Sequence, residues 1–402
     1  MKFLILGDLH IGKGINIGKS QSGKINSRIQ DQIDLLEWSL NYCLQNKINT
    51  IVITGDVYQD PRPHPGVISI VMCWLIKCQS HSVSVHIIRG NHDVMRSGTY
   101  SVSALDLVSD VNLHAKVYKD FSVLELENDT SIVFIPFRDK RMYEVDSSEE
   151  AIEKLNNEID SLSPKGKVKI AIGHLALEGS LEVGDEIADA LNEIYVPKDV
   201  FKTFDFVWMG HVHHPQVVQE SPYIAHIGSL DRSDFSRTET ENDKIAVVFD
   251  TATCSFKNIV LPTRTLKHIQ IVVPNGKDST EFVINHLCLI DSREKLINSM
   301  LRVEIILNGL EIDNIQRDKV EGYLYNNIGV FHVVAITESR KANQESISSE
   351  ESFDNSLDIS KTIHKWADLK GEFESEEEKL KFKALAFECL EDYKSKYNEQ
   401  AT

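Results

Sequence analysis

The sequence predicts an α/β fold, and three observations support this prediction. Over the first two-thirds of the 402 residues, short apolar runs alternate with longer segments of helical periodicity. From about Thr263 a shorter set of strand-like and helical segments follows. Near the carboxyl end, apolar residues recur at helical spacing. We therefore expect a large layered domain, a small α/β domain and a helical tail.

Seven apolar runs of strand length are expected to build the sheets of the large domain. They are residues 2–7, 50–54, 83–89, 131–136, 168–173, 204–209 and 244–250. The first run is too short for a signal peptide and ends at Asp8, so it is interpreted as a buried strand. No apolar stretch approaches the length that spans a bilayer, and we expect a cytoplasmic protein that contacts no membrane.

A helix is predicted between the first two strands. Ser27 and Gln30 have the spacing of a capping box, which marks a helix start. One stripe of this helix is apolar and is expected to face the core: Ile29, Ile33, Leu36, Leu40 and Cys43.

The composition changes along the chain suggest four parts. The large domain is expected to span 1–263, and a small α/β domain 264–337 contains apolar runs at 268–273 and 301–307. Residues 338–358 are rich in Ser, Glu and Asn, which is typical of a flexible acidic linker. Two apolar stripes separated by Gly371 predict a helix–loop–helix over 359–402.

The net charge of -18 is unusual for a protein that binds nucleic acid, because phosphate contacts normally require lysine and arginine. Residues 338–402 hold 16 acidic and 10 basic residues, a net of -6, which leaves -12 for the rest. Any affinity for DNA must therefore come from local features, among which bound metal cations are the strongest charges.

Five polar clusters each follow a predicted strand. They read Gly7-Asp8-Leu9-His10, Gly55-Asp56, Gly90-Asn91-His92-Asp93, Gly173-His174 and Gly210-His211-Val212-His213. Functional residues of layered α/β folds gather at the carboxyl ends of strands. In extended chain, residues two apart point to the same side, so Asp8 can converge with His10, and His211 with His213. Oxygen and nitrogen donors without thiolate suit manganese, iron or zinc in an open catalytic site.

This series of clusters resembles the calcineurin-like metallophosphoesterases, whose pattern is D-x-H, G-D, G-N-H-[DE], G-H and G-H-x-H. The resemblance covers about the first 250 residues and implies a four-layer β-sandwich flanked by helices. It also implies two divalent metal ions, with manganese expected. Carried over to this sequence, it assigns seven ligands: Asp8, His10 and His213 to one ion, Asn91, His174 and His211 to the other, and Asp56 to both.

Two further residues of the third cluster are candidates for catalysis under this resemblance. His92 would stabilise the transition state or protonate the leaving oxygen. Asp93 either orients the His92 imidazole or caps a turn.

Features beyond the metal ligands indicate a nuclease. The run Gly228-Ser229-Leu230-Asp231-Arg232-Ser233-Asp234-Phe235 resembles the G-S-x-x-R-x-D-F run of SbcD nucleases, the bacterial relatives of the eukaryotic meiotic-recombination-eleven nuclease. The compact, acidic chain most resembles the phage recombination nuclease subunits. This resemblance implies a homodimeric DNA exonuclease and endonuclease of repair and recombination, which acts on duplex ends and single strands. The small domain would cap DNA, and the tail would bind a coiled-coil ABC ATPase of the SbcC type.

Several alternatives stay open at this point. The metal site alone also fits a phosphatase or phosphodiesterase for a small molecule or phosphoprotein, and a non-catalytic scaffold is a third hypothesis. Basic residues after the first cluster form either a phosphate-contacting loop or a solvated one: Lys13, Lys19, Lys24 and Arg28. Gln59 occupies a position where some nuclease relatives carry a histidine, which leaves the balance of exonuclease and endonuclease activity open.

Overall fold

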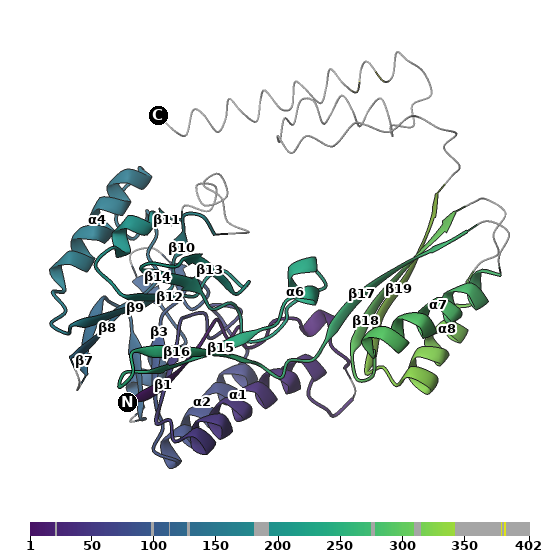
Figure 1. Ribbon diagram of the computed structural model, residues 1–402, viewed down its shortest axis with the longest axis horizontal. Coiled ribbons are helices and arrows are strands. Elements are labelled where there is room, and N and C mark those ends of the chain that lie inside the picture. Colours follow the sequence, from purple (N-terminus) through teal and green to yellow (C-terminus); the bar gives the residue numbers. More distant parts are fainter. Residues whose placement is uncertain are drawn as a thin grey trace. The chain divides into compact units, whose positions relative to one another are not determined.

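The computed structural model describes residues 1–20, 22–97, 100–111, 113–126, 129–180, 193–274, 278–308 and 315–341, with Lys379 and Phe382 in the tail. Two six-stranded sheets build the large domain (Figure 1). The first has the order β16 (Ser255–Val260), β15 (Ile245–Asp250), β1 (Lys2–Leu6), β2 (Thr50–Ile53), β3 (Ser84–Ile88), β6 (Ala115–Tyr118). The second has the order β13 (Gln216–Gln219), β14 (Tyr223–His226), β12 (Phe206–Met209), β9 (Val168–Gly173), β8 (Thr130–Ile135), β7 (Ser122–Leu126).

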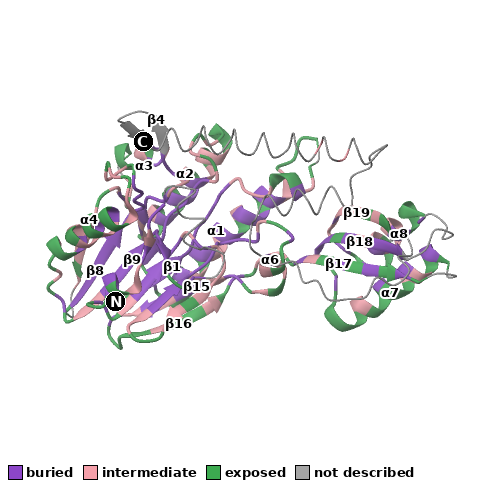
Figure 2. Ribbon diagram, turned by 90° about the horizontal axis from the view of Figure 1, so that it is seen from above, coloured by how far each residue is buried: buried purple, intermediate pink, exposed green. Residues whose placement is uncertain are grey.

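The alternation of side chains along the strands creates four layers. Leu4 and Leu6 of β1 pack in a core with the helices α1 (Ser27–Asn46) and α2 (Pro65–Ser80). Phe3 and Ile5 point the other way, into a core shared by the two sheets. On the far side of the second sheet, Val133 packs against α4 (Ser148–Ser161). The buried strands between these helical layers are visible in Figure 2. This arrangement confirms the predicted four-layer α/β sandwich.

All seven predicted strands are present, with ends shifted by a residue or two. Parallel pairing joins β1, β2, β3 and β6 in the first sheet and β8, β9, β12 and β14 in the second. Because parallel strands end at the same edge, each sheet gathers the residues that follow its strands.

Helix α1 begins at Ser27, but the predicted capping box is wrong. The N-cap is Asn26, whose side chain accepts a hydrogen bond from the Arg28 backbone N–H. The Ser27 hydroxyl instead accepts from the Lys19 backbone N–H at 2.8 Å, and the Gln30 amide donates to Asp34. The apolar stripe is oriented as predicted, with Ile29, Leu36, Leu40 and Cys43 buried.

A separate core lies in the residues that follow. Strands β17 (Leu266–Val273), β18 (Met300–Asn308) and β19 (His332–Lys341) form a parallel sheet, one face of which packs on α7 (Ser279–Glu294) and α8 (Arg317–Tyr323). Strand β19 was not predicted from the sequence, and it extends beyond residue 337. The expected linker 338–358 beyond Lys341, and the expected helix pair 359–402 apart from Lys379 and Phe382, lie outside the described residues.

Shorter elements connect these parts of the chain. They are η1 (Ile15–Ile17), β4 (Met95–Ser97), β5 (Tyr100–Val102), α3 (Asp106–Asp110), β10 (Ala176–Leu177), β11 (Tyr195–Val196), η2 (Lys198–Phe201), α6 (Arg237–Glu241) and η3 (Leu324–Ile328). In the described part of the chain, no helix combines the length and apolar character that a bilayer crossing requires.

Candidate metal centre

The seven candidate ligands come from both sheets and meet at one site. Asp8, Asp56 and Asn91 follow β1, β2 and β3 of the first sheet. The three histidines at positions 174, 211 and 213 follow β9 and β12 of the second sheet, and His10 lies two residues beyond Asp8. Asp8, His10, Asp56 and His174 are each at most 2% exposed.

The first group of ligands is held close together. His10 Nε2 lies 2.8 Å from His213 Nε2 and 3.4 Å from Asp56 Oδ2. Donor atoms of Asp8, His10 and His213 all lie within 4.8 Å of one another. Two imidazole nitrogens and carboxylate oxygens at this spacing can share one cation.

A second group converges beside the first. Asn91 Oδ1 lies 2.8 Å from His174 Nε2 and 3.3 Å from His211 Nδ1. Asp56 Oδ2 is 3.4 Å from His174 Nε2, as it is from His10 Nε2. Asp56 therefore lies between a histidine of each group, so its carboxylate could contact a cation held by either group.

The electrostatics of the site suit cations. Burial lowers the pKa of His10 to about 3 and that of His213 to about 2, so both imidazoles are neutral at pH 7, the form that binds metal. Burial opposes charge on His174, but Asp56 and Asp8 outweigh it and raise the His174 pKa to about 10. Burial raises the pKa of Asp8 to about 7. Buried carboxylates and lone pairs that face one another are stabilised by a positive ion between them.

The backbone is strained where it aims these ligands. His10, Asp56 and His211 have positive φ angles of 44°, 47° and 79°, a region that side chains with a Cβ rarely adopt. Gly210 is also required, because a Cβ there would lie 2.2 Å from Asp8 Oδ1 and 2.8 Å from His174 Nδ1. Strain of this kind persists when the surrounding structure holds a functional geometry.

Comparison with known proteins agrees with this geometry. Residues 1–215, more than half of the chain, match the calcineurin-like phosphoesterase family. The chain belongs to this family. A curated relative, the SbcD component of the SbcCD nuclease from Staphylococcus saprophyticus, is 24% identical over 292 residues, which cover 70% of this chain and 74% of that protein.

Two solved structures are more distant. A dimetal phosphatase from Danio rerio is 13% identical with a TM-score of 0.39, covering 62% of this chain and 91% of that one. A cold-active protein-tyrosine phosphatase from a psychrophilic Shewanella species is 11% identical with a TM-score of 0.28, covering 64% and 80%.

In this phosphoesterase, His92 lies beside the two ligand groups. Its ring meets that of His10 edge to face, with centroids 5.0 Å apart. The His92 backbone N–H donates to Asp56 Oδ1 at 2.8 Å, and Nδ1 donates to the Gln59 carbonyl at 2.9 Å. With Nδ1 held in this way, Nε2 is the nitrogen that remains for a substrate.

Asp93 is buried behind His92. Its carboxylate accepts hydrogen bonds from the backbone N–H groups of Gly90 at 3.0 Å and Tyr58 at 3.2 Å. These contacts favour the turn-capping alternative for Asp93, since the described partner of the His92 ring is the Gln59 carbonyl.

The outer nitrogens of three histidines have partners that sequence reasoning did not assign. His174 Nδ1 donates to the Thr54 carbonyl at 3.0 Å, and His211 Nε2 lies 2.9 Å from Glu193 Oε2. Lys13 Nζ lies 3.0 Å from His213 Nδ1. Thr54 could have been found from its place between strand β2 and Gly55-Asp56, whereas Glu193 has no motif around it.

The run 228–235 supports the first metal ligand. Asp8 pairs with Ser229 as in a parallel sheet: the Asp8 N–H donates to the Gly228 carbonyl, and the Leu230 N–H to the Asp8 carbonyl. Asp231 accepts from the fully buried Arg28 guanidinium, which also binds Asp31 at 2.6 Å. Arg28 therefore braces the fold and is neither solvated nor available to phosphate.

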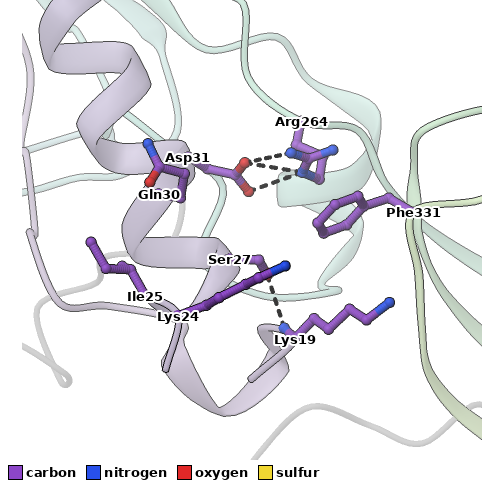
Figure 3. Close-up of a pocket in the computed structure, with 8 residues that line it drawn as sticks. All are labelled: Lys19, Lys24, Ile25, Ser27, Gln30, Asp31, Arg264 and Phe331. Atoms are coloured by element: carbon purple, nitrogen blue, oxygen red, sulfur yellow. Dashed lines mark hydrogen bonds and ion pairs between the residues drawn. The ribbon is translucent and has the colours of Figure 1, made fainter. Parts of the chain in front are cut away.

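Lys19 and Lys24 lie in the loop that precedes α1. Together with Phe331 and Arg264 they line a cavity of about 470 Å³ between the start of α1 and the β17–β19 segment (Figure 3). Arg264 forms hydrogen bonds with Asp31 and stacks on the Phe331 ring at 3.8 Å. Of the four basic residues at positions 13, 19, 24 and 28, Lys19 and Lys24 thus share one cavity, whereas Lys13 contacts His213 and Arg28 is buried in the fold.

Proposed function

We propose that this phosphoesterase is a manganese-dependent DNA nuclease, the exonuclease and endonuclease component of an SbcCD-type repair and recombination complex. The observation that carries the proposal is the length of the similarity to the SbcD protein. The matched stretch of 292 residues covers 70% of the chain, so it extends beyond residues 1–215, the part that matches the phosphoesterase family. The likeness therefore includes sequence beyond the last candidate metal ligand, His213, and is not confined to the part that all phosphoesterases share.

The site residues support phosphodiester hydrolysis. Asp8, His10 and His213 would hold one cation, Asn91, His174 and His211 the other, and Asp56 both. When bound, two divalent cations clamp a phosphate and activate a water for in-line attack. His92 lies beside His10 with Nδ1 bound to the Gln59 carbonyl, and its Nε2 would donate a proton to the leaving oxygen. The oxygen and nitrogen donors, without thiolate, are consistent with manganese.

Local positive charge would offset the acidity of the chain. Lys19, Lys24 and Arg264 surround the cavity of Figure 3, and phosphate contacts of this kind supply most of the affinity for a DNA backbone.

In this proposal residues 1–263 are the nuclease domain and 264–337 the DNA-capping domain. Residues 338–358 are the linker, and 359–402 bind the ATPase.

The proposed assembly contains two copies of the chain. Helix α2 carries Ile76 with 52% of its surface exposed, and Leu44 of α1 is 40% exposed. These two exposed side chains lie on helices that contact each other, and we take this face as the proposed partner surface. Light scattering should show a dimer that Ile76→Arg dissociates, whereas Ile297→Arg, on another exposed apolar residue, should leave it intact. A monomeric wild-type chain would contradict the homodimer.

The nuclease proposal is tested by offering three substrates in Mn²⁺. A labelled linear duplex, bis(p-nitrophenyl) phosphate and p-nitrophenyl phosphate are compared, with Asp56→Asn as the control for contaminating enzymes. We expect cleavage of the duplex and of the diester by the wild type only. Efficient hydrolysis of the monoester with an intact duplex would support a phosphatase instead.

Co-purification from the native cell tests the proposed ATPase partner, and the absence of a coiled-coil ATPase would contradict that partner.

A further inference from the structure

Glu193 occupies a position behind the metal centre that the ligand motifs do not include. Its Oε2 atom lies 2.9 Å from His211 Nε2. Only 11% of the Glu193 side chain and 12% of the His211 side chain are exposed, so the contact is largely removed from solvent. A buried carboxylate–imidazole contact is stronger and better defined than one on the surface.

We infer that Glu193 is a positioning residue that fixes the tautomer and the orientation of His211 for the second metal ion. The inference rests on the proposed two-metal centre. A carboxylate can only accept, so His211 Nε2 carries the proton that the contact requires. When a metal ion replaces any proton on the other ring nitrogen, the lone pair is on Nδ1, the atom that lies 3.3 Å from Asn91 Oδ1 of the same ligand group. This is the tautomer a metal ligand needs.

His174, the other histidine assigned to the same ion, shows the same arrangement. Its Nδ1 donates to the Thr54 carbonyl, and its Nε2 faces Asn91 Oδ1 at 2.8 Å. Each histidine thus donates outward to an oxygen through one ring nitrogen and turns the other toward Asn91 Oδ1, where the metal ion would take the place of a proton. Thr54 acts through its backbone, which no substitution removes, whereas Glu193 acts through a side chain that can be changed.

The first ion's histidines are held differently. His213 Nδ1 faces the Lys13 ammonium, which is a donor, and His10 Nδ1 is buried without a hydrogen-bond partner in the described structure. A carboxylate raises the basicity of the imidazole it contacts, and an ammonium group does not. Loss of Glu193 should therefore affect the second ion and spare the first.

The surrounding structure keeps Glu193 in place. Its backbone forms an isolated antiparallel bridge with Asp139, close to Phe137. The Phe137 ring stacks on the His211 ring with centroids 6.2 Å apart and an interplanar angle of 26°. His211 is thus held by an aromatic ring and by a carboxylate. Because its φ angle is 79°, its backbone has little freedom to reorient the ring if the Glu193 contact is lost.

The test is a titration of the metal-free full-length chain with Mn²⁺ by calorimetry, with bound metal counted by mass spectrometry. Wild type should bind two ions. Glu193→Ala should bind one ion normally and the other about 10–100-fold more weakly. Glu193→Gln keeps an oxygen acceptor and should restore part of the loss. Glu178→Ala, on an exposed glutamate after strand β10, is the matched control and should behave as wild type.

Each other outcome is decisive. Two ions bound by Glu193→Ala with wild-type affinities would overturn the role of Glu193. An equal loss of affinity for both ions in Glu193→Ala would overturn it as well. The same holds if Glu193→Gln loses as much affinity as Glu193→Ala while its melting temperature stays that of the wild type. A wild-type chain that binds no divalent cation would instead refute the metal centre on which the inference rests.

Discussion

His10 Nε2 and His213 Nε2 lie 2.8 Å apart, although 203 residues separate them and they follow strands of different sheets. Their pKa values are lowered by burial, so neither ring is charged at pH 7. In the metal-free chain one neutral ring donates its Nε2–H to the other, and a cation that replaces this proton would be bound by both nitrogens. This relationship is the simplest sign that the sandwich is built to seat a cation.

Gly210→Ala should abolish Mn²⁺ binding without unfolding the chain. The added methyl group would lie 2.2 Å from Asp8 Oδ1 and 2.7 Å from Thr54 Oγ1, so it would displace Asp8 together with the hydroxyl that donates to the Asp8 carboxylate. Calorimetry measures the loss. Gly322→Ala is the control, because the nearest heavy atom to its new methyl group is 4.0 Å away. Wild-type affinity in Gly210→Ala would show that Asp8 is not a ligand.

His92→Ala should lower the rate of diester hydrolysis about 10²–10⁴-fold while both metal ions stay bound. The reason is geometric: the His92 ring donates to the Gln59 carbonyl and lies beside His10 rather than between the ligands. Steady-state kinetics measures the rate, and mass spectrometry of the same samples counts the bound metal ions. As a control, substitution of the exposed His114 by Ala should change neither the rate nor the number of bound ions. Unchanged hydrolysis in His92→Ala would remove His92 from the mechanism.

Arg28→Met should destabilise the chain by about 3–5 kcal/mol. The guanidinium is fully buried between Asp31 and Asp231, so its removal leaves the buried Asp231 without its ion-pair partner and leaves Asp31 with Arg264 alone. Urea unfolding measures the change in the free energy of unfolding. Arg237→Met removes an exposed pair with Glu241 and should cost about 0.5 kcal/mol or less. Equal effects of the two substitutions would argue against the buried brace.

His86 should make the free energy of unfolding depend on pH. Burial lowers its folded-state pKa to about 4 from the ordinary value of 6.5. Between these values the unfolded chain binds more protons, so stability falls as pH decreases through this window. His86→Gln removes this titration and should lessen the loss between pH 7 and pH 4 by about 2 kcal/mol. Urea unfolding in a metal chelator measures it, and an unchanged pH dependence would contradict the shift.

The candidate metal ligands could be located from the sequence because their clusters follow strands whose apolar runs are easily recognised. Their assignment to ions came from the resemblance of the five clusters together to the metallophosphoesterase motifs. Strands such as β14 and β16 were not predicted, since β14 is short and β16 is an edge strand whose side chains are mostly exposed. Their position depends on pairing partners far away in the chain.

The residues that support the ligands could not be predicted for a related reason. Glu193 reaches the site through a tertiary contact, and nothing in its local sequence distinguishes it from an ordinary loop residue. Lys13 and Gln59 were singled out in the sequence, but their contacts with His213 and His92 depend on the folded chain. The capping box at Ser27 failed in the same way, because the competing contact of its hydroxyl with Lys19 is made by a loop that only the folded chain brings close.

The most direct test of the central claim is anomalous X-ray diffraction from crystals grown in Mn²⁺. A two-metal centre predicts two anomalous peaks about 3.5–4 Å apart, with Asp56 between them and one peak beside each ligand group. A single peak, no peak, or peaks away from Asp56 would contradict a two-metal centre at this site.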